Sequence, residues 1–250
     1  KKELAKIPFG AYAIKRSFVE RGHVRASKFD VDIKMPRNRS LAEIERLIAK
    51  SRLAPGVKDR MRKVYRTLAK AETHVHGHRH HDIHFEQLGD IDSLVDIAAT
   101  CIGLDLLGIE KIIYSFVPVT AKLAPATAKL LEGRSVYFIP LFFENVTPTG
   151  MAILAALGEQ VSSAGMALCR YGACGYGAGT ADPAEVANVL RVTRIQPLVN
   201  RRTDEVMVLE ANIDDMNPQF FESLFERALA AGALDVFVQS VIMKKSRPGF

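Results

Sequence analysis

The sequence lacks the features that mark a membrane protein or a disulfide-stabilised one. No apolar run approaches the ~18 residues that a membrane-spanning helix needs, and the opening residues KKELAKIPFG carry no apolar core of a secretory signal. Cysteine is scarce: Cys101, Cys169 and Cys174 are the only three, and none belongs to a CxxC pair. We therefore expect a cytoplasmic protein with no membrane partner, no disulfide scaffold and no cysteine-rich zinc site.

Positive and negative charges are unevenly divided along the chain. Residues 1–80 hold 21 Lys/Arg and 8 Asp/Glu, whereas residues 81–250 hold 13 and 20. Many of the basic residues follow helical spacing in KDRMRKVYRTLAKAE. Tyr65, the one aromatic residue of this stretch, belongs to the apolar face of the expected helix, so it does not interleave with the basic residues as a platform for base stacking. We interpret the basic part as a solvated helix surface and predict no nucleic-acid partner.

The hydrophobic pattern of this 250-residue chain predicts an α+β fold, or loosely a mixed α/β one. Strands are expected over 11–16 and 26–34. Ser40 and Glu43 form a capping-box pattern that opens a helix over 41–51, and a second helix over 57–71 completes a helical hairpin. The further expected helices cover 92–107, 125–131, 151–157 and 218–231, and the further strands 111–119, 136–139, 188–194, 204–212 and 236–244.

Composition divides the chain into two expected domains. The first covers 1–200, with a mixed sheet, the helical hairpin and an internal His-rich segment at 72–86. The stretch IQPLVNRRT resembles a linker, and 203–250 then reads as the start of a C-terminal nucleotide-binding domain. The strand–helix–strand order of 203–250 predicts a partial ferredoxin-like βαβ unit. Because one such unit is a thin basis for a domain, we expect this domain to be cut short.

The most specific local signal is HVHGHRHHDIH, which contains six of the seven histidines of the chain: His74, His76, His78, His80, His81 and His84. Imidazole is a neutral nitrogen ligand that suits nickel, zinc and copper, and Asp82 and Glu86 can add oxygen ligands. Without nearby cysteines a structural zinc finger is improbable. Nickel is therefore the leading metal, with zinc, cobalt and copper as alternatives, and an incidentally polar loop is the competing interpretation.

Polar residues at two expected helix starts are further candidates. Asp92 and Asp96 are four residues apart and share a helix face. Asp96 interrupts the apolar run LVDIAATCIG, so a buried Asp96 would need an ion pair, hydrogen bonds or a metal. Thr147 and Thr149 precede another helix, where hydroxyl and free N–H groups can hold an anion. Helix capping is the alternative for Asp92 and Thr147, and a structural salt bridge for Asp96.

Closely spaced glycines form another candidate site, in YGACGYGAGTAD. Gly175, Gly177 and Gly179 would let backbone N–H groups approach phosphate oxygens. The stretch has no GK[ST] of a Walker A loop and no full dinucleotide fingerprint, so a tight loop or bulge is an adequate alternative. Cys174 has no base or second thiol nearby in sequence, and we do not propose it as a nucleophile.

The final candidate combines two charged clusters of the C-terminal part. Asp214 and Asp215 lie between an expected strand and a helix, where paired carboxylates can hold a hard divalent ion that carries nucleotide phosphates. Lys244, Lys245 and Arg247 end the next expected strand and offer matching positive charge. The alternative is a capped helix followed by a solvated basic turn.

Several of these segments together resemble a known family. They are HFEQLGDIDSLVDIAATCIGLDLLGI, APATAKLL, VTPTGMAIL, GYGAGTAD with NVLRV, VLEANIDDMNPQ and GALDVFVQSVIMKKSRPG, preceded by the His-rich stretch. In this order they are similar to the nickel-insertion proteins of nickel-pincer nucleotide cofactor synthesis, which make the cofactor of lactate racemase. A strand and loop resembling DPFSGISGDM, with which that family usually opens, does not occur before Lys1, and the stretch before APAT is short. We therefore expect parts of the family's active site to be missing from this chain.

The resemblance implies a cytosolic CTP-dependent nickel chelatase, a metal insertase of the lyase class. Its small-molecule substrate would be pyridinium bis-thiocarboxylate mononucleotide, and CTP with manganese or magnesium would be cleaved to CMP and pyrophosphate. The six clustered histidines would gather nickel, and Asp214, Asp215, Lys244, Lys245 and Arg247 would belong to the CTP-binding part. The alternative is a non-enzymatic nickel store or metallochaperone. A homo-oligomer is compatible with either.

Overall fold

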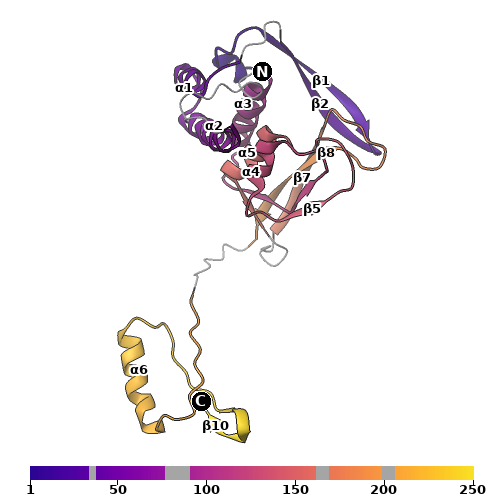
Figure 1. Ribbon diagram of the computed structural model, residues 1–250. Coiled ribbons are helices and arrows are strands. Elements are labelled where there is room, and N and C mark those ends of the chain that lie inside the picture. Colours follow the sequence, from indigo (N-terminus) through magenta and orange to yellow (C-terminus); the bar gives the residue numbers. More distant parts are fainter. Residues whose placement is uncertain (34–37, 77–90, 162–168, 199–205) are drawn as a thin grey trace. The chain divides into compact units, whose positions relative to one another are not determined.

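The computed structural model describes residues 1–33, 38–76, 91–161, 169–198 and 206–250 (Figure 1). The chain divides into two compact units, one over Lys1–Val199 and one over Asn200–Phe250. Helices and several small sheets are combined in the described residues, which confirms the predicted α+β class.

The predicted helical hairpin of the first unit is present. Helix α1 covers Leu41–Lys50 and helix α2 covers Pro55–His76, so the second helix is longer than expected. At the start of α1 the backbone N–H of Glu43 donates to Ser40 Oγ at 3.3 Å, and that of Ser40 donates to the Glu43 carboxylate at 2.9 Å. This confirms the capping box and explains why the helix begins at this point.

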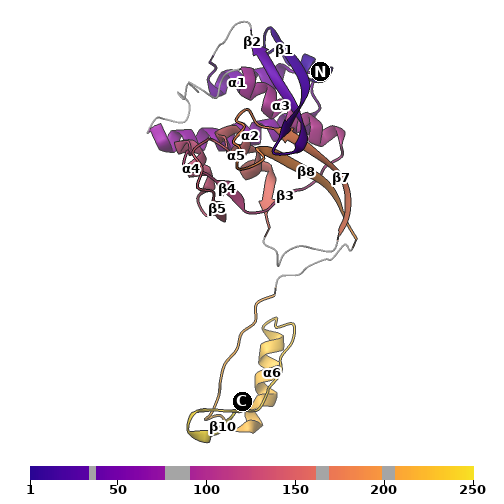
Figure 2. The same ribbon diagram turned by 90° about the vertical axis from the view of Figure 1, so that its right-hand side faces the viewer.

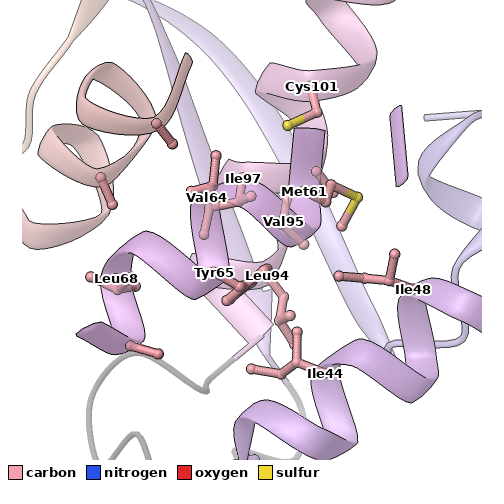
Figure 3. Packing of buried hydrophobic residues seen from close by; sticks show 14 of the residues in the cluster. Ile44, Ile48, Met61, Val64, Tyr65, Leu68, Leu94, Val95, Ile97 and Cys101 are labelled. Carbon is pink, nitrogen blue, oxygen red and sulfur yellow. The ribbon is translucent and has the colours of Figure 1, made fainter. Parts of the chain in front are cut away.

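Helix α2 is central to the core of the first unit. It packs against α1 and against the helices α3 (Ile91–Leu106), α4 (Pro125–Leu131) and α5 (Pro148–Leu157). Met61 and Tyr65 of α2 and Leu94 of α3 are fully buried in this cluster (Figure 3). Burial of one such apolar side chain contributes about 1.5–3 kcal/mol, so the helical cluster contributes substantially to the stability of this unit.

A four-stranded sheet lies beside the helices, in the order β1–β2–β7–β8 (Figure 2). Its strands are β1 (Tyr12–Arg21), β2 (Val24–Ile33), β7 (Cys169–Ala178) and β8 (Val189–Pro197). The pairs β1–β2 and β7–β8 are antiparallel, and β2 joins β7 in parallel. Tyr12, Ile14, Val31 and Ile33 pack against the core, so one end of the β1–β2 hairpin is anchored there.

The strand expected over 111–119 is divided into β3 (Ile112–Tyr114) and β4 (Val117–Val119). Each half has its own parallel partner: β3 pairs with β6 (Gly158–Gln160) and β4 with β5 (Val136–Phe138). The Gln160 amide donates to the carbonyl oxygens of Ser115 and Ser135, at 3.3 and 2.7 Å. The Gln160 side chain therefore supplies hydrogen bonds between β3 and β4, where the chain passes from one partner strand to another.

The second unit has less regular structure than expected. A 3-10 turn at Pro218–Phe220 leads into helix α6 (Phe221–Ala230), and β9 (Val241–Ile242) pairs antiparallel with β10 (Pro248–Gly249). The strand expected over 204–212 is absent from residues 206–212, and the one expected over 236–244 is reduced to β9. The parallel βαβ pairing is thus not formed in the described residues, where no neighbouring edge offers these segments a partner.

Candidate functional site

The His-rich segment follows directly from α2. His74, in the last turns of that helix, is exposed to solvent. The side chains of the other five clustered histidines lie outside the described residues: His76, His78, His80, His81 and His84. Within the described residues no three His, Cys, Asp or Glu side chains come together as a metal site. The nickel site therefore remains a prediction. In the sequence it falls between the end of α2 and the start of α3.

Glu132, at the end of α4, is a carboxylate whose pKa is affected by His74. Its pKa is lowered chiefly because Lys129 Nζ donates a hydrogen bond to it at 2.6 Å, and the charges of Lys129 and His74 lower it further. Sequence reasoning missed Glu132 because 58 positions separate it from His74 and no local pattern connects them. A carboxylate thus stands within electrostatic reach of the first imidazole of the cluster.

Asp92 and Asp96 both extend from the exposed side of α3. The concern that Asp96 is a buried carboxylate is therefore wrong. Its sequence neighbours Val95 and Ile97 are buried, but successive helical residues are turned by about 100°, which leaves Asp96 outside the core. An apolar sequence run on a well-packed helix can include one such outward position.

Thr147 and Thr149 have different surroundings at the start of α5. The hydroxyl oxygen of Thr147 accepts a hydrogen bond from the backbone N–H of Gly150 at 3.1 Å, which is an N-cap. Thr149 is buried, with 8% of its surface exposed. The capping interpretation is favoured over an anion site, because the cap satisfies one of the N–H groups that an anion would use.

The glycine-rich stretch is an extended strand and not a phosphate-binding loop. Gly175 and Gly177 belong to β7 and face Val192 and Leu190 of β8 across an antiparallel ladder. Gly179 follows, and its N–H donates to the carbonyl of Asn188 at 2.9 Å. A ladder therefore takes the place of the cradle of free N–H groups, and the bulge given as an alternative corresponds to a register shift between Tyr171 and Cys174.

The charged clusters of the second unit are exposed. Lys244, Lys245 and Arg247 form the turn between β9 and β10, where the N–H of Met243 donates to the carbonyl of Arg247 at 2.8 Å. Asp214 and Asp215 are exposed and follow Ile213, whose backbone pairs with that of Phe250. In the described part of the chain no ion pair links the two clusters, so both charges remain available to a ligand.

Two cysteines lie in opposite environments. Burial raises the pKa of the Cys101 thiol to about 12, which keeps it protonated and unsuited to bind metal. The pKa of exposed Cys174 is lowered, first by the hydroxyl of Thr193, which donates to its sulfur at 3.4 Å, and also by Tyr176, Tyr171 and Arg191. Sequence reasoning missed this because Thr193 and Arg191 come close to Cys174 only through the pairing of β7 with β8.

Aromatic and basic side chains also interleave on the β1–β2 hairpin, which sequence reasoning missed. The guanidinium of Arg16 lies over the rings of Phe18 and Phe29, at 4.8 and 5.9 Å from their centroids. That of Arg25 lies 4.7 Å from the centroid of Phe18. The hairpin therefore has the interleaved aromatic and basic side chains that the basic helix lacks.

Comparison with known proteins identifies the class. The family model described as "Nickel insertion protein" matches residues 1–250, and the chain belongs to this family. A protein of Geobacter sp. (strain M21) is 42% identical over 99% of this chain and 67% of its own length, and one of Geotalea daltonii is 40% identical over 100% and 67%. Both carry the name "Putative nickel insertion protein", and this chain spans about two thirds of their length. No solved structure matches the chain.

Among the described residues, the helices are all too short or too polar to traverse a bilayer.

Proposed function

We propose that this chain contributes to a CTP-dependent enzyme that inserts nickel into pyridinium bis-thiocarboxylate mononucleotide, a step in the synthesis of the nickel-pincer nucleotide cofactor. One observation carries the proposal: six imidazoles fall within HVHGHRHHDIH, in a chain that belongs to the nickel insertion family over its whole length. Nickel is the cargo of this reaction. It must be held selectively and then released to a stronger ligand.

The ligand chemistry fits transfer better than permanent storage. Imidazole and carboxylate groups bind nickel in an exchangeable way, whereas a closed set of thiolates would retain it. Cys101 is buried and protonated, so it cannot compete for the metal. The sulfur atoms of the substrate are softer ligands than the histidines, and nickel transfer from His74 and its neighbours to sulfur is therefore favourable.

The second unit supplies groups suited to the nucleotide. The oxygen atoms of Asp214 and Asp215 are hard donors that fit manganese or magnesium, with phosphate oxygens completing the coordination. Lys244, Lys245 and Arg247 would neutralise the remaining phosphate charge. The bound ion would assist the cleavage of CTP to CMP and pyrophosphate by stabilising charge on the departing phosphate oxygens.

The alternative function is a nickel store or metallochaperone without enzymatic activity. The same histidines would serve it, because a store needs only reversible binding. The two functions differ in their response to nucleotide: a store is indifferent to CTP, whereas the chelatase consumes CTP when its thiolated substrate is present.

The deciding experiment measures nickel transfer to the thiolated mononucleotide by the full-length protein, with and without CTP. We expect transfer that requires CTP and releases pyrophosphate. A variant with His74, His76, His78, His80 and His81 changed to Ala should stay folded and lose most nickel binding, because a polar segment contributes little to a hydrophobic core. Transfer that ignores CTP would favour the store.

The matched control for the histidine variant is His23→Asn. His23 is the one histidine outside the cluster, with 99% of its side chain exposed, and it lies in the β1–β2 turn at a positive φ of 65° that Asn tolerates. Nickel binding by this variant should equal that of the unaltered protein. If the clustered histidines can be removed without reducing nickel affinity, the segment has no part in the mechanism.

A further inference from the structure

The outer edge of strand β5 is apolar and has no partner strand in the described residues. β5 pairs in parallel with β4 along one edge, and no described strand joins the other edge. All three residues of β5 are exposed: Val136 by 38%, Tyr137 by 51% and Phe138 by 77%. In β4, by contrast, Val117 and Val119 are buried in the core. β5 therefore extends the small sheet beyond the part that the core covers.

The β5 edge lacks the charges that protect the edges of the larger sheet. The outer strands of that sheet are β1 and β8, which carry Arg16 and Arg191 among other charged residues. Charged side chains on an edge strand discourage pairing with another chain, whereas an apolar edge favours it. The sequence SVYFI, which covers β5 and one residue on each side, has no charged residue and no proline. Nothing in the sequence of β5 therefore opposes the addition of another strand.

The backbone of β5 is self-complementary at this edge. The Ser135 carbonyl accepts from β4 at 3.2 Å, and the Ile139 N–H donates to β4 at 2.8 Å. Because the bonding groups alternate along a strand, the N–H and C=O groups of Val136 and Phe138 point to the free edge. An antiparallel copy of β5, related by a two-fold axis at Tyr137, would place Val136 opposite Phe138 on both sides of the axis. Each of these pairs could exchange both N–H···O bonds.

The aromatic side chains around this edge provide enough surface for a dimer. Phe116, which precedes β4, is 47% exposed, and Phe142, which follows β5, is 80% exposed. Since an aromatic side chain can bury about 150–250 Å², these two residues with Tyr137 and Phe138 leave about 400–600 Å² available on one copy. Two copies would together remove about twice that area from water, which is close to the roughly 1,000 Å² that a specific interface needs.

We propose that β5 is a dimerisation edge, to which a second copy of this chain adds its own β5 in antiparallel orientation. A two-fold contact uses the same surface on both copies, and the pairing of Val136 with Phe138 meets this condition. Tyr137 would face the same residue of the second copy at a non-hydrogen-bonded position, where side chains come closest. Pro140 has no N–H to donate, so the ladder would end just beyond β5. The proposal concerns the first unit alone and is independent of the nickel and CTP chemistry proposed above.

The test is sedimentation equilibrium of the full-length protein, without nickel or CTP, and we expect the unaltered protein to dimerise. Tyr137→Lys and Tyr137→Glu should each weaken self-association at least about tenfold, because each removes an aromatic contact and places like charges opposite one another. An equimolar mixture of the two variants should restore the dimer, since opposite charges then meet at the two-fold position. Added salt should weaken this mixed dimer.

Two further variants separate the β5 edge from other apolar surface. Phe138→Ser removes an exposed side chain of the proposed interface and should also weaken self-association about tenfold. Leu190→Lys is the matched control, because Leu190 is a 66% exposed residue of the edge strand β8. Its change should leave the dimer intact. Circular dichroism establishes that each variant is folded.

Three results would overturn the proposal. An unaltered protein that stays monomeric at about 100 μM would show that the edge binds no second copy. Self-association that is unchanged in Tyr137→Lys, Tyr137→Glu and Phe138→Ser would assign the contact to another surface. If each Tyr137 variant is monomeric and the mixture is monomeric as well, the two copies do not pair about this residue. Each result is independent of whether the protein inserts nickel.

Discussion

Ile213 and Phe250 exchange both of their backbone hydrogen bonds, with N···O distances of 2.7 and 2.9 Å. This pairing holds the backbone just before Asp214 against Phe250, the residue that follows β10. The ring of Phe250 also meets that of Phe221 edge-on, at a centroid distance of 5.0 Å, which adds α6 to the same cluster. The two charged groups of the second unit are thus connected through one antiparallel contact and not through a parallel βαβ sheet.

The first prediction concerns the carboxylates beside this contact. Asp214→Asn or Asp215→Asn should reduce manganese-dependent CTP binding by about tenfold or more, because an amide cannot replace the charge of a carboxylate on a divalent ion. Nickel binding by the His-rich segment should be unchanged. Equilibrium binding of labelled CTP and of nickel to the full-length protein measures both effects.

Glu226→Gln provides the control for this prediction, since Glu226 is an exposed carboxylate of α6 away from the aspartate pair in sequence. It should bind CTP as the unaltered protein does. Normal CTP binding by both aspartate variants, or a loss of nickel in place of nucleotide, would contradict the division into separate nickel and nucleotide sites.

The second prediction concerns Asp96. Since this residue is exposed, Asp96→Ala should change the free energy of unfolding by only about 0.5 kcal/mol, and not by the larger amount expected of a stranded buried charge. Leu94→Ala, two residues away in the same helix and fully buried, should cost about 2–5 kcal/mol. Urea denaturation of the two variants gives the comparison. Equal losses would indicate that Asp96 is structurally essential.

The features that could be predicted from sequence are those that local rules determine. The capping box at Ser40 and Glu43 and the helical hairpin that follows it depend on residues a few positions apart, and both were predicted correctly. The partnership of β2 with β7 could not be predicted, because the paired residues Ser27 and Gly177 are 150 positions apart in the sequence. The exposed side of Asp96 was missed for a related reason: the helix's packing partners determine which side is buried.

The same distinction applies to the candidate site. Clustering of histidines is visible in the sequence, since the six residues lie within eleven positions. The stacking of Arg25 on Phe18 is not visible in the sequence, because Arg25 reaches Phe18 only after the β1–β2 hairpin has formed. The glycines were identified by their spacing in the sequence. Only the structure distinguishes Gly175 and Gly177, where an added Cβ atom would meet nothing within 4 Å, from Gly172 and Gly179, where it would clash.

The third prediction tests the start of α1. Ser40→Ala removes the side-chain acceptor of the capping box and should cost about 1 kcal/mol of unfolding free energy, visible as a lower Tm. Ser40→Thr keeps the hydroxyl and should recover most of that loss. If the Ala and Thr variants are equally unstable, the hydrogen bond to Glu43 is not the cause.

The last prediction concerns the reactivity of the thiols. Only the thiolate form of cysteine reacts readily with iodoacetamide. Cys174 is exposed and its pKa is lowered, whereas the pKa of buried Cys101 is raised to about 12. At neutral pH the folded protein should therefore be alkylated at Cys174 at least about tenfold faster than at Cys101, as mass spectrometry of the cleaved protein can measure.

The pH dependence of this reaction tests the cause of the difference. Because the lowered pKa lets the Cys174 thiolate form at a lower pH than in an ordinary cysteine, its alkylation rate should level off at a lower pH. Thr193→Val removes the hydroxyl that donates to the sulfur, so the pKa should rise, the profile should move to higher pH and the rate at neutral pH should fall. Val also suits a strand, which keeps β8 intact. An unchanged profile in Thr193→Val would mean that this hydroxyl does not stabilise the thiolate, and faster reaction of Cys101 would mean that the helical core opens more readily than its packing implies.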